Sequence, residues 1–137
     1  MKDRILGLDV GDKYIGIAVS DLLGITAQGV STLKRKKLDE DLEQLKNIVK
    51  EYDVRQIVIG LPKNMDGSIG LQGNKVMNFG NYLKKRLDCK IIFWDERLTT
   101  KIAENILIEG NVRREKRKSF IDKIAAQSIL QNYMDSL

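Results

Sequence analysis

The chain has 137 residues, of which 42% are hydrophobic and 31% are charged, and its formal net charge is +5. This length suits one globular domain, 1–137, and the composition excludes a disordered or fibrous protein. A single cysteine excludes an intrachain disulfide, and the absence of histidine excludes serine–histidine and cysteine–histidine catalysis as well as the usual zinc ligands. Any metal site must therefore use oxygen ligands, which favours Mg²⁺, Mn²⁺ or Ca²⁺.

The distribution of apolar and charged residues also indicates localisation and partners. No apolar run is long enough to span a bilayer, and Asp9 interrupts the apolar N-terminus before a signal-peptide core could form. We therefore expect a cytoplasmic protein with no membrane partner. The excess of positive charge favours a polyanionic partner, which points toward nucleic acid.

Residues 5–21, ILGLDVGDKYIGIAVSD, predict an antiparallel hairpin with strands 5–10 and 14–20. Alternation places Asp9 on the same face as Ile5 and Gly7, at the end of an apolar strand where an isolated charge would be costly. Two explanations are open. The carboxylate is capped within the turn or paired with Lys13, or it binds a divalent metal ion.

The next segments predict an edge strand and a helix. Residues 27–33 form the strand, which Gly29 weakens, and apolar residues at helical spacing predict a helix over 39–52. Between them lies a basic tetrad, which is either a solvated loop or a phosphate-contact patch. Its members are Lys34, Arg35, Lys36 and Lys37.

Two continuous apolar runs, 56–61 and 90–94, predict strands buried on both faces of a parallel sheet. The loop 63–73 between them is rich in glycine, which permits tight turns or the close approach of a phosphate, and its spacing favours tight turns. A helix follows the loop. Its apolar face carries Val76, Phe79, Leu83 and Leu87.

Asp95 and Glu96 follow the last predicted strand directly. In open α/β sheets ligands bind at the carboxyl ends of the strands, so the position of this acidic pair favours a site. The alternative is that one of the two caps the next helix or pairs with Arg97. That helix begins after Thr99 or Thr100 and ends at Gly110, with Ile102, Ile106 and Leu107 on its apolar face.

The densest basic cluster is 113–118, five of whose six residues are cationic, and a final helix is predicted from about 119 to 133. Asp122 shares a stripe of this helix with Ala126, Ile129 and Tyr133. The residue is therefore a candidate to approach the core from the helix. The alternative is a capping box, in which Ser119 and Asp122 only satisfy the start of the helix.

The order of the elements predicts an α/β fold with a five-stranded mixed sheet and helices on both faces. The first three strands should be antiparallel, and the last two, reached by helical crossovers, should lie parallel to the first. Asp9, the Asp95–Glu96 pair and Asp122 could then converge at one edge. Carboxylates that converge in this way repel one another unless one or two hard cations neutralise them.

Several ordered segments together resemble the YqgF (RuvX) family over nearly the whole chain. They are residues 6–11 (LGLDVG), 15–21 (IGIAVSD), 60–62 (GLP), 95–100 (DERLTT) and 122–131 (DKIAAQSILQ). Members of this family are described as pre-16S rRNA nucleases and were earlier described as Holliday junction resolvases. The resemblance implies a ribonuclease H-like fold.

The resemblance also implies roles for individual residues. Asp9, Glu96 and Asp122 would be catalytic metal ligands, with Asp95 as the substitute for Glu96, and the cation would be Mg²⁺ or Mn²⁺. Lys13 and the loop 67–73 would flank the substrate. Tyr14 departs from the family pattern, which has arginine after the lysine.

The leading hypothesis is a metal-dependent nuclease for structured RNA, acting at the 5′ end of pre-16S rRNA in ribosome biogenesis as a monomer or weak homodimer. Its predicted nucleic-acid-binding residues are Lys13, Lys34, Arg35, Lys36, Lys37, Arg97, Arg113, Arg114, Lys116, Arg117 and Lys118. Alternatives are a Holliday junction resolvase acting on branched DNA and a non-catalytic nucleic-acid-binding factor in rRNA maturation or transcription. A phosphotransferase of the actin-like and sugar-kinase group would need two such domains, and 137 residues provide one.

Overall fold

The computed structural model describes residues 4–95 and 114–137, with side chains for 4–95 and 123–137. The helix predicted to end at Gly110 lies outside the described residues. The described elements, in chain order, are β1 (Arg4–Val10), β2 (Tyr14–Ser20), β3 (Ala27–Lys34), α1 (Leu38–Glu51), β4 (Val54–Leu61), α2 (Leu71–Arg86), β5 (Lys90–Asp95) and α4 (Arg114–Asp135). None of the described helices has the length and apolar character needed to cross a membrane.

The five strands form one mixed sheet in the order β3-β2-β1-β4-β5. β2 pairs antiparallel with β1 and β3, whereas β4 pairs parallel with β1 and β5. This arrangement confirms the predicted meander followed by two parallel strands, and it confirms β3 as an edge strand. The carboxyl ends of β1, β3, β4 and β5 consequently meet at one edge of the sheet.

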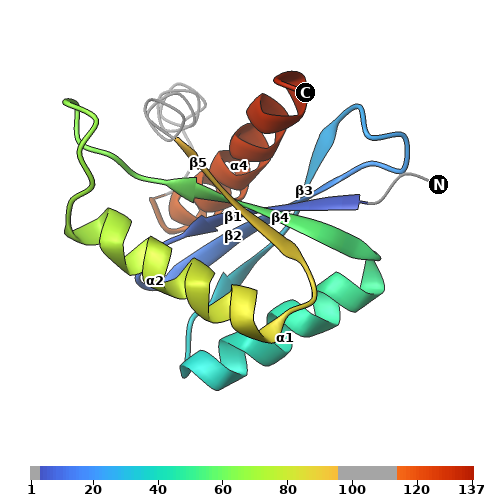
Figure 1. The fold of residues 1–137 in the computed structure, drawn as a ribbon, viewed down its shortest axis with the longest axis horizontal. Helices are drawn as coiled ribbons and strands as arrows, with labels where there is room; N and C mark the ends of the chain where they lie inside the picture. The colour runs from blue at the N-terminus through green and yellow to red at the C-terminus, as the bar shows by residue number, and fades with distance from the viewer. Residues whose placement is uncertain (1–3, 96–113) are drawn as a thin grey trace.

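Helices cover both faces of the sheet, as predicted, with α1 and α2 along one side and α4 along the other (Figure 1). Alternation along the strands separates two groups of core residues. On β1, Leu6 and Leu8 belong to the larger core beneath α1 and α2. The smaller core beneath α4 contains Ala126 and Ile129 from the helix and Val58 from β4.

α4 begins at Arg114, about a turn earlier than the predicted start near residue 119. The expected boundary was wrong because residues 114–118 are arginine, glutamate and lysine, which favour helix and include no helix breaker. Most of the basic cluster therefore belongs to the helix. The capping-box explanation of Ser119 and Asp122 is also wrong, because Asp122 lies eight residues beyond Arg114, inside the helix.

Candidate functional site

Asp9 lies at the carboxyl end of β1, half-buried, with a glycine beside it on each neighbouring strand. Gly16 pairs with Asp9 across the β1–β2 ladder. On the other side Leu8 pairs with Ile59, which makes Gly60 the neighbour of Asp9 on β4. The positions directly opposite Asp9 on both adjacent strands are therefore glycines, which have no side chain. A hard cation with its water ligands needs this kind of space around a carboxylate.

α4 packs closely on the face of β1 that carries Asp9. A Cβ atom on Gly7 would lie 2.7 Å from the Leu130 Cβ atom and 3.0 Å from the Ala126 carbonyl oxygen. Only glycine allows this approach, so Gly7 fixes where the helix crosses the strand.

The direction of α4 is set by its contacts with β3. Gln131 accepts a hydrogen bond from the backbone N–H of Ala27 at 2.8 Å, near the start of β3, whereas Lys123 covers Gly29 further along the strand. α4 therefore runs antiparallel to β3, and also to β1, which points the same way as β3.

This antiparallel packing brings the positions of Asp9 and Asp122 to one level of the sheet. Asp9 lies two residues beyond Gly7, an advance of about 7 Å along a strand. Asp122 lies four residues before Ala126, about 6 Å back along the helix toward the same edge. The two acidic positions thus share one face and one edge of the sheet.

Asp95 ends β5 at the same edge but on the opposite face. Its partner in β4 is Leu61, which belongs to the core beneath α1 and α2. The preceding residue, Trp94, lies on the α4 side, where its ring meets Tyr133 edge-on at 5.4 Å. The register therefore separates Asp95 from Asp9, and Glu96 lies outside the described residues.

The carboxylates predicted to form a metal site are only partly covered by the structure. Side chains are described for Asp9 and Asp95, but not for Glu96 or Asp122. Among the residues described, no three aspartate, glutamate or cysteine side chains are grouped so that they could hold a metal ion. The metal-ligand set thus remains a prediction, supported by the placement of Asp9 and Asp122.

The predicted basic residues that the structure describes gather near the same edge. Lys13 is exposed in the turn after β1, and Lys34 pairs with Tyr14 at the end of β3. Lys36 and Lys37 are exposed just before α1. Arg97 and Arg113 lie outside the described residues, and for Arg114, Lys116, Arg117 and Lys118 the structure gives the helical backbone alone.

Arg35 differs from the other members of the basic tetrad because it points into the protein. Its side chain is 22% exposed, and its guanidinium group pairs with Asp41 at 3.4 Å. Arg35 also donates a hydrogen bond to the carbonyl oxygen of Gly11 at 3.0 Å. These contacts use N–H donors of the Arg35 guanidinium group that would have to face phosphate if Arg35 bound nucleic acid, as predicted.

Sequence reasoning missed two lysines at this site. Lys75 of α2 forms an exposed ion pair with Asp12 of the β1–β2 turn, at 3.6 Å. The aliphatic part of Lys123 lies against Gly29, where a Cβ atom would be 2.8 Å from the lysine Cγ atom. For Lys123 the available signal was Gly29, because a glycine within a strand can mark the close approach of another side chain and not only a weak strand.

The loop between β4 and α2 forms a tight turn, as its spacing predicted. Gly67 has a φ of 88°, and its N–H donates to the carbonyl oxygen of Asn64 at 2.8 Å. Hydrogen bonds from the hydroxyl and the backbone N–H of Ser68 lower the pKa of Asp66. The loop follows the carboxyl end of β4, so it borders the edge that carries Asp9.

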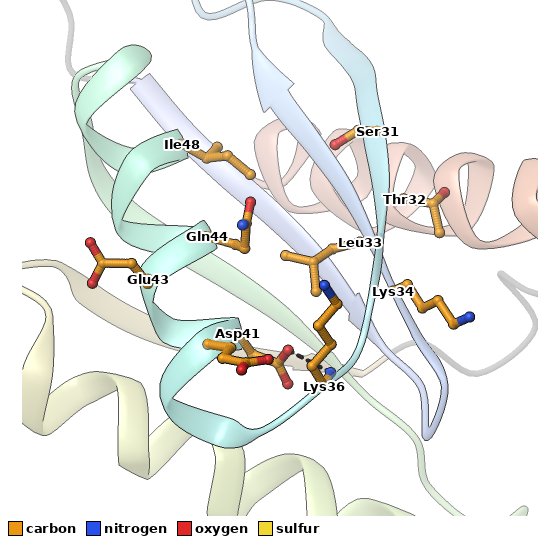
Figure 2. Close-up of a pocket in the computed structure, with 10 residues that line it drawn as sticks. Ser31, Thr32, Leu33, Lys34, Lys36, Asp41, Glu43, Gln44 and Ile48 are labelled. Carbon is orange, nitrogen blue, oxygen red and sulfur yellow. Dashed lines mark hydrogen bonds between the residues drawn. The ribbon is translucent and has the colours of Figure 1, made fainter.

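A separate cavity of about 540 Å³ lies between β3 and α1 (Figure 2). Its lining mixes both charges with apolar side chains: Ser31, Thr32, Leu33, Lys34, Lys36, Glu40, Asp41, Glu43, Gln44 and Ile48. The α1 side of the sheet is opposite the face that carries Asp9. The cavity is therefore distinct from the acidic site.

Comparison with known proteins identifies the family. The family model RuvX, described as "Holliday junction resolvase", matches residues 3–136. A protein of Caldanaerobacter subterraneus subsp. tengcongensis is 56% identical over 134 residues, covering 97% of this chain and 96% of the relative. A protein of Clostridium tetani is 57% identical over 134 residues, covering 98% and 97%. Both are named "Putative pre-16S rRNA nuclease".

Solved structures with the same fold include two Holliday junction resolvases bound to junction substrates. Thermus thermophilus RuvC has a TM-score of 0.59 at 10% identity, with 98% of each chain covered. The fowlpox virus resolvase has a TM-score of 0.56 at 14% identity, with 97% of each chain covered. At these identities the structural likeness establishes the ribonuclease H-like fold alone. The family model and the relatives with more than half of their residues identical establish the family, and the chain belongs to the RuvX family.

Proposed function

We propose that this protein is a divalent-metal-dependent nuclease that hydrolyses phosphodiester bonds in structured RNA, with the 5′ end of precursor 16S rRNA as its substrate. The observation that carries the proposal is the antiparallel packing of α4 on β1 through Gly7 and Ala126. Each element carries one acidic residue beyond this contact, Asp9 on the strand and Asp122 on the helix.

Asp9, Glu96 and Asp122 are the proposed metal ligands and catalytic residues. Asp95 is the weaker candidate of its pair, because its register places it on the opposite face from Asp9. Carboxylate oxygens without histidine or cysteine suit Mg²⁺ or Mn²⁺. A cation held there would activate water and stabilise the leaving oxygen of the phosphodiester.

The exposed lysines provide the proposed contacts with the nucleic-acid backbone. Lys13, Lys36 and Lys37 lie beside the edge that carries Asp9. α4 contributes its basic first turns, because its antiparallel direction brings its N-terminal end toward this edge. Such contacts position a phosphate backbone without reading its sequence, so binding should weaken steeply with added salt.

RNA is the proposed substrate because relatives with more than half of their residues identical are named for pre-16S rRNA. The description of the family model names Holliday junctions instead. The resolvase structures support only the fold at their low identity. Branched DNA is therefore the competing substrate that an assay must include.

The proposal is tested by incubating wild type and Asp9→Asn with precursor 16S rRNA and with a four-way DNA junction, in Mg²⁺, Mn²⁺ or EDTA. Asp12→Asn is the matched control, because Asp12 is an exposed carboxylate in the turn that follows β1. We expect wild type and Asp12→Asn to cleave RNA with metal. Asp9→Asn should bind RNA with the same salt dependence but not cleave it.

Each other result has a defined meaning. Full cleavage by Asp9→Asn would refute the assigned role of Asp9. RNA binding that ignores EDTA, with no cleavage by wild type, would favour a non-catalytic binding factor. Cleavage of the junction alone would replace RNA by branched DNA as the substrate.

A further inference from the structure

Arg35 joins three parts of the molecule that are far apart in the sequence. Its Nη1 atom donates to the carbonyl oxygen of Gly11 at 3.0 Å, and its Nε atom lies 3.4 Å from a carboxylate oxygen of Asp41. The guanidinium group also covers the ring of Phe79, 4.8 Å from its centroid. One side chain at the end of β3 therefore contacts the β1–β2 turn, the start of α1 and the middle of α2.

Asp41 is the buried partner in this arrangement. Its side chain is 2% exposed, and a buried carboxylate is costly unless cationic or hydrogen-bonding groups compensate it. One oxygen faces Arg35, and the other accepts a hydrogen bond from the backbone N–H of Lys36 at 2.9 Å. Figure 2 shows Asp41 beside Lys36, with this hydrogen bond as a dashed line. The Asp41 carboxylate thereby holds both the side chain of Arg35 and the backbone of Lys36.

Arg35 contacts the turn that follows Asp9 in the sequence, between β1 and β2. Gly11 lies two residues after Asp9, and its N–H closes the turn on the carbonyl oxygen of Tyr14 at 2.8 Å. The backbone N–H of Arg35 donates to the carbonyl oxygen of Lys13, also at 2.8 Å. Backbone and side chain of Arg35 thus hold both sides of the turn.

An exposed ion pair on the same turn is weaker. The ion pair between Asp12 and Lys75 joins side chains that are 64% and 63% exposed, and pairs of this kind contribute little. Arg35, by contrast, reaches the turn from the interior, with its side chain 22% exposed.

We propose that Arg35, held by Asp41, is a positioning residue that fixes the Asp9 carboxylate for metal binding, and not a contact for nucleic acid. The inference rests on the proposed role of Asp9 as a metal ligand. Groups that hydrogen-bond directly to metal ligands typically contribute about 10-fold to 100-fold to metal affinity. Arg35 acts through the backbone of the turn at Gly11, so we expect a contribution at or below the lower end of this range. Lysine cannot replace Arg35 fully, because it lacks the planar fork that serves two acceptors while stacking on Phe79.

The experiment compares Arg35→Lys with Lys36→Gln, which changes the adjacent exposed lysine. Mn²⁺ affinity is measured without RNA by electron paramagnetic resonance, and RNA affinity is measured in EDTA. We expect Arg35→Lys to weaken Mn²⁺ binding by up to about 10-fold and to keep its RNA affinity. Lys36→Gln should show the reverse pattern.

Kinetics provide a second measurement on the same proteins. A positioning role predicts that Arg35→Lys lowers kcat at fixed Mn²⁺, leaves KM for RNA unchanged and recovers activity as Mn²⁺ is raised. Mn²⁺ affinity equal to wild type, or a loss of RNA affinity matching that of Lys36→Gln, would overturn the proposal.

Asp41→Asn provides an independent variant if Arg35→Lys does not fold. Asparagine keeps an oxygen that accepts from the Lys36 N–H, but it places an uncharged NH2 group, which cannot accept a hydrogen bond, opposite Arg35 Nε. Mn²⁺ affinity should therefore fall and RNA affinity should not. Because Mn²⁺ binding is measured without substrate, a wild-type protein that binds Mn²⁺ but cleaves no RNA would refute the proposed nuclease and leave the role of Arg35 measurable.

Discussion

Replacing Gly7 with alanine should slow catalysis about 100-fold in a protein that still folds. The new Cβ atom would lie 2.7 Å from the Leu130 Cβ atom, whereas carbon atoms pack best at about 3.5–4.0 Å. The second neighbour is the Ala126 carbonyl oxygen at 3.0 Å, which is backbone and cannot rotate away. α4 must therefore move away from β1 by roughly 1 Å, the shortfall in this contact.

The size of the effect follows from this displacement. Overpacking of a core typically costs about 1–3 kcal/mol of stability, which a folded domain tolerates. A misplacement of about 1 Å in a catalytic arrangement typically lowers the rate about 100-fold. Since α4 carries Asp122 and β1 carries Asp9, we expect kcat of Gly7→Ala to fall by about that factor.

Cleavage of precursor 16S rRNA and urea denaturation, measured on the same preparation, separate the two effects. Gly80→Ala is the matched control, because its Cβ atom would meet the Phe93 ring on the face covered by α2. This control should lose stability while keeping kcat near the wild-type value. Equal losses of kcat in Gly7→Ala and Gly80→Ala would refute the link between the α4 contact and the acidic site.

Three further predictions concern stability and reactivity. Ile129→Ala removes a fully buried side chain between α4 and the sheet, so urea denaturation should show a loss of about 2–5 kcal/mol. Hydrogen bonds from the backbone of Ile25 and Thr26 lower the pKa of Asp21, so its stabilisation exists above the unfolded-state pKa and disappears as pH falls through the folded pKa. The Tm difference between wild type and Asp21→Ala should therefore shrink from about pH 7 to about pH 3, and a constant difference would contradict it. Burial, with the Asp88 charge, raises the pKa of the Cys89 thiol, so at about pH 8 maleimide should modify the native protein more slowly than the urea-unfolded chain.

The sheet could be predicted from sequence because its signals are local. Alternation along the first hairpin and continuous apolar runs in the later strands identify each strand and the faces it buries. Helical crossovers then require parallel pairing, which the register of β1 with β4 and of β4 with β5 confirms. The same alternation predicted the face of β1 on which Asp9 lies, and the turn after residue 10 predicted its place near the carboxyl end of the strand.

The environment of Arg35 could not be predicted in this way. Arg35 stands among three lysines, and a cationic run usually marks a solvated surface. Its inward contacts with Gly11 and Phe79 arise only when the turn, α1 and α2 are assembled. The start of α4 was missed for a related reason, since a dense run of charge resembles a loop although arginine, lysine and glutamate all favour helix.

Direct binding of Mn²⁺ to wild type, Asp9→Asn, Asp122→Asn and the double variant, measured by electron paramagnetic resonance without nucleic acid, tests most sharply whether strand and helix share one metal site. If Asp9 and Asp122 bind the same cation, each single substitution should remove most of the affinity, and the double variant should lose little more. Wild-type Mn²⁺ affinity in both single variants would contradict a shared site at the carboxyl edge of β1.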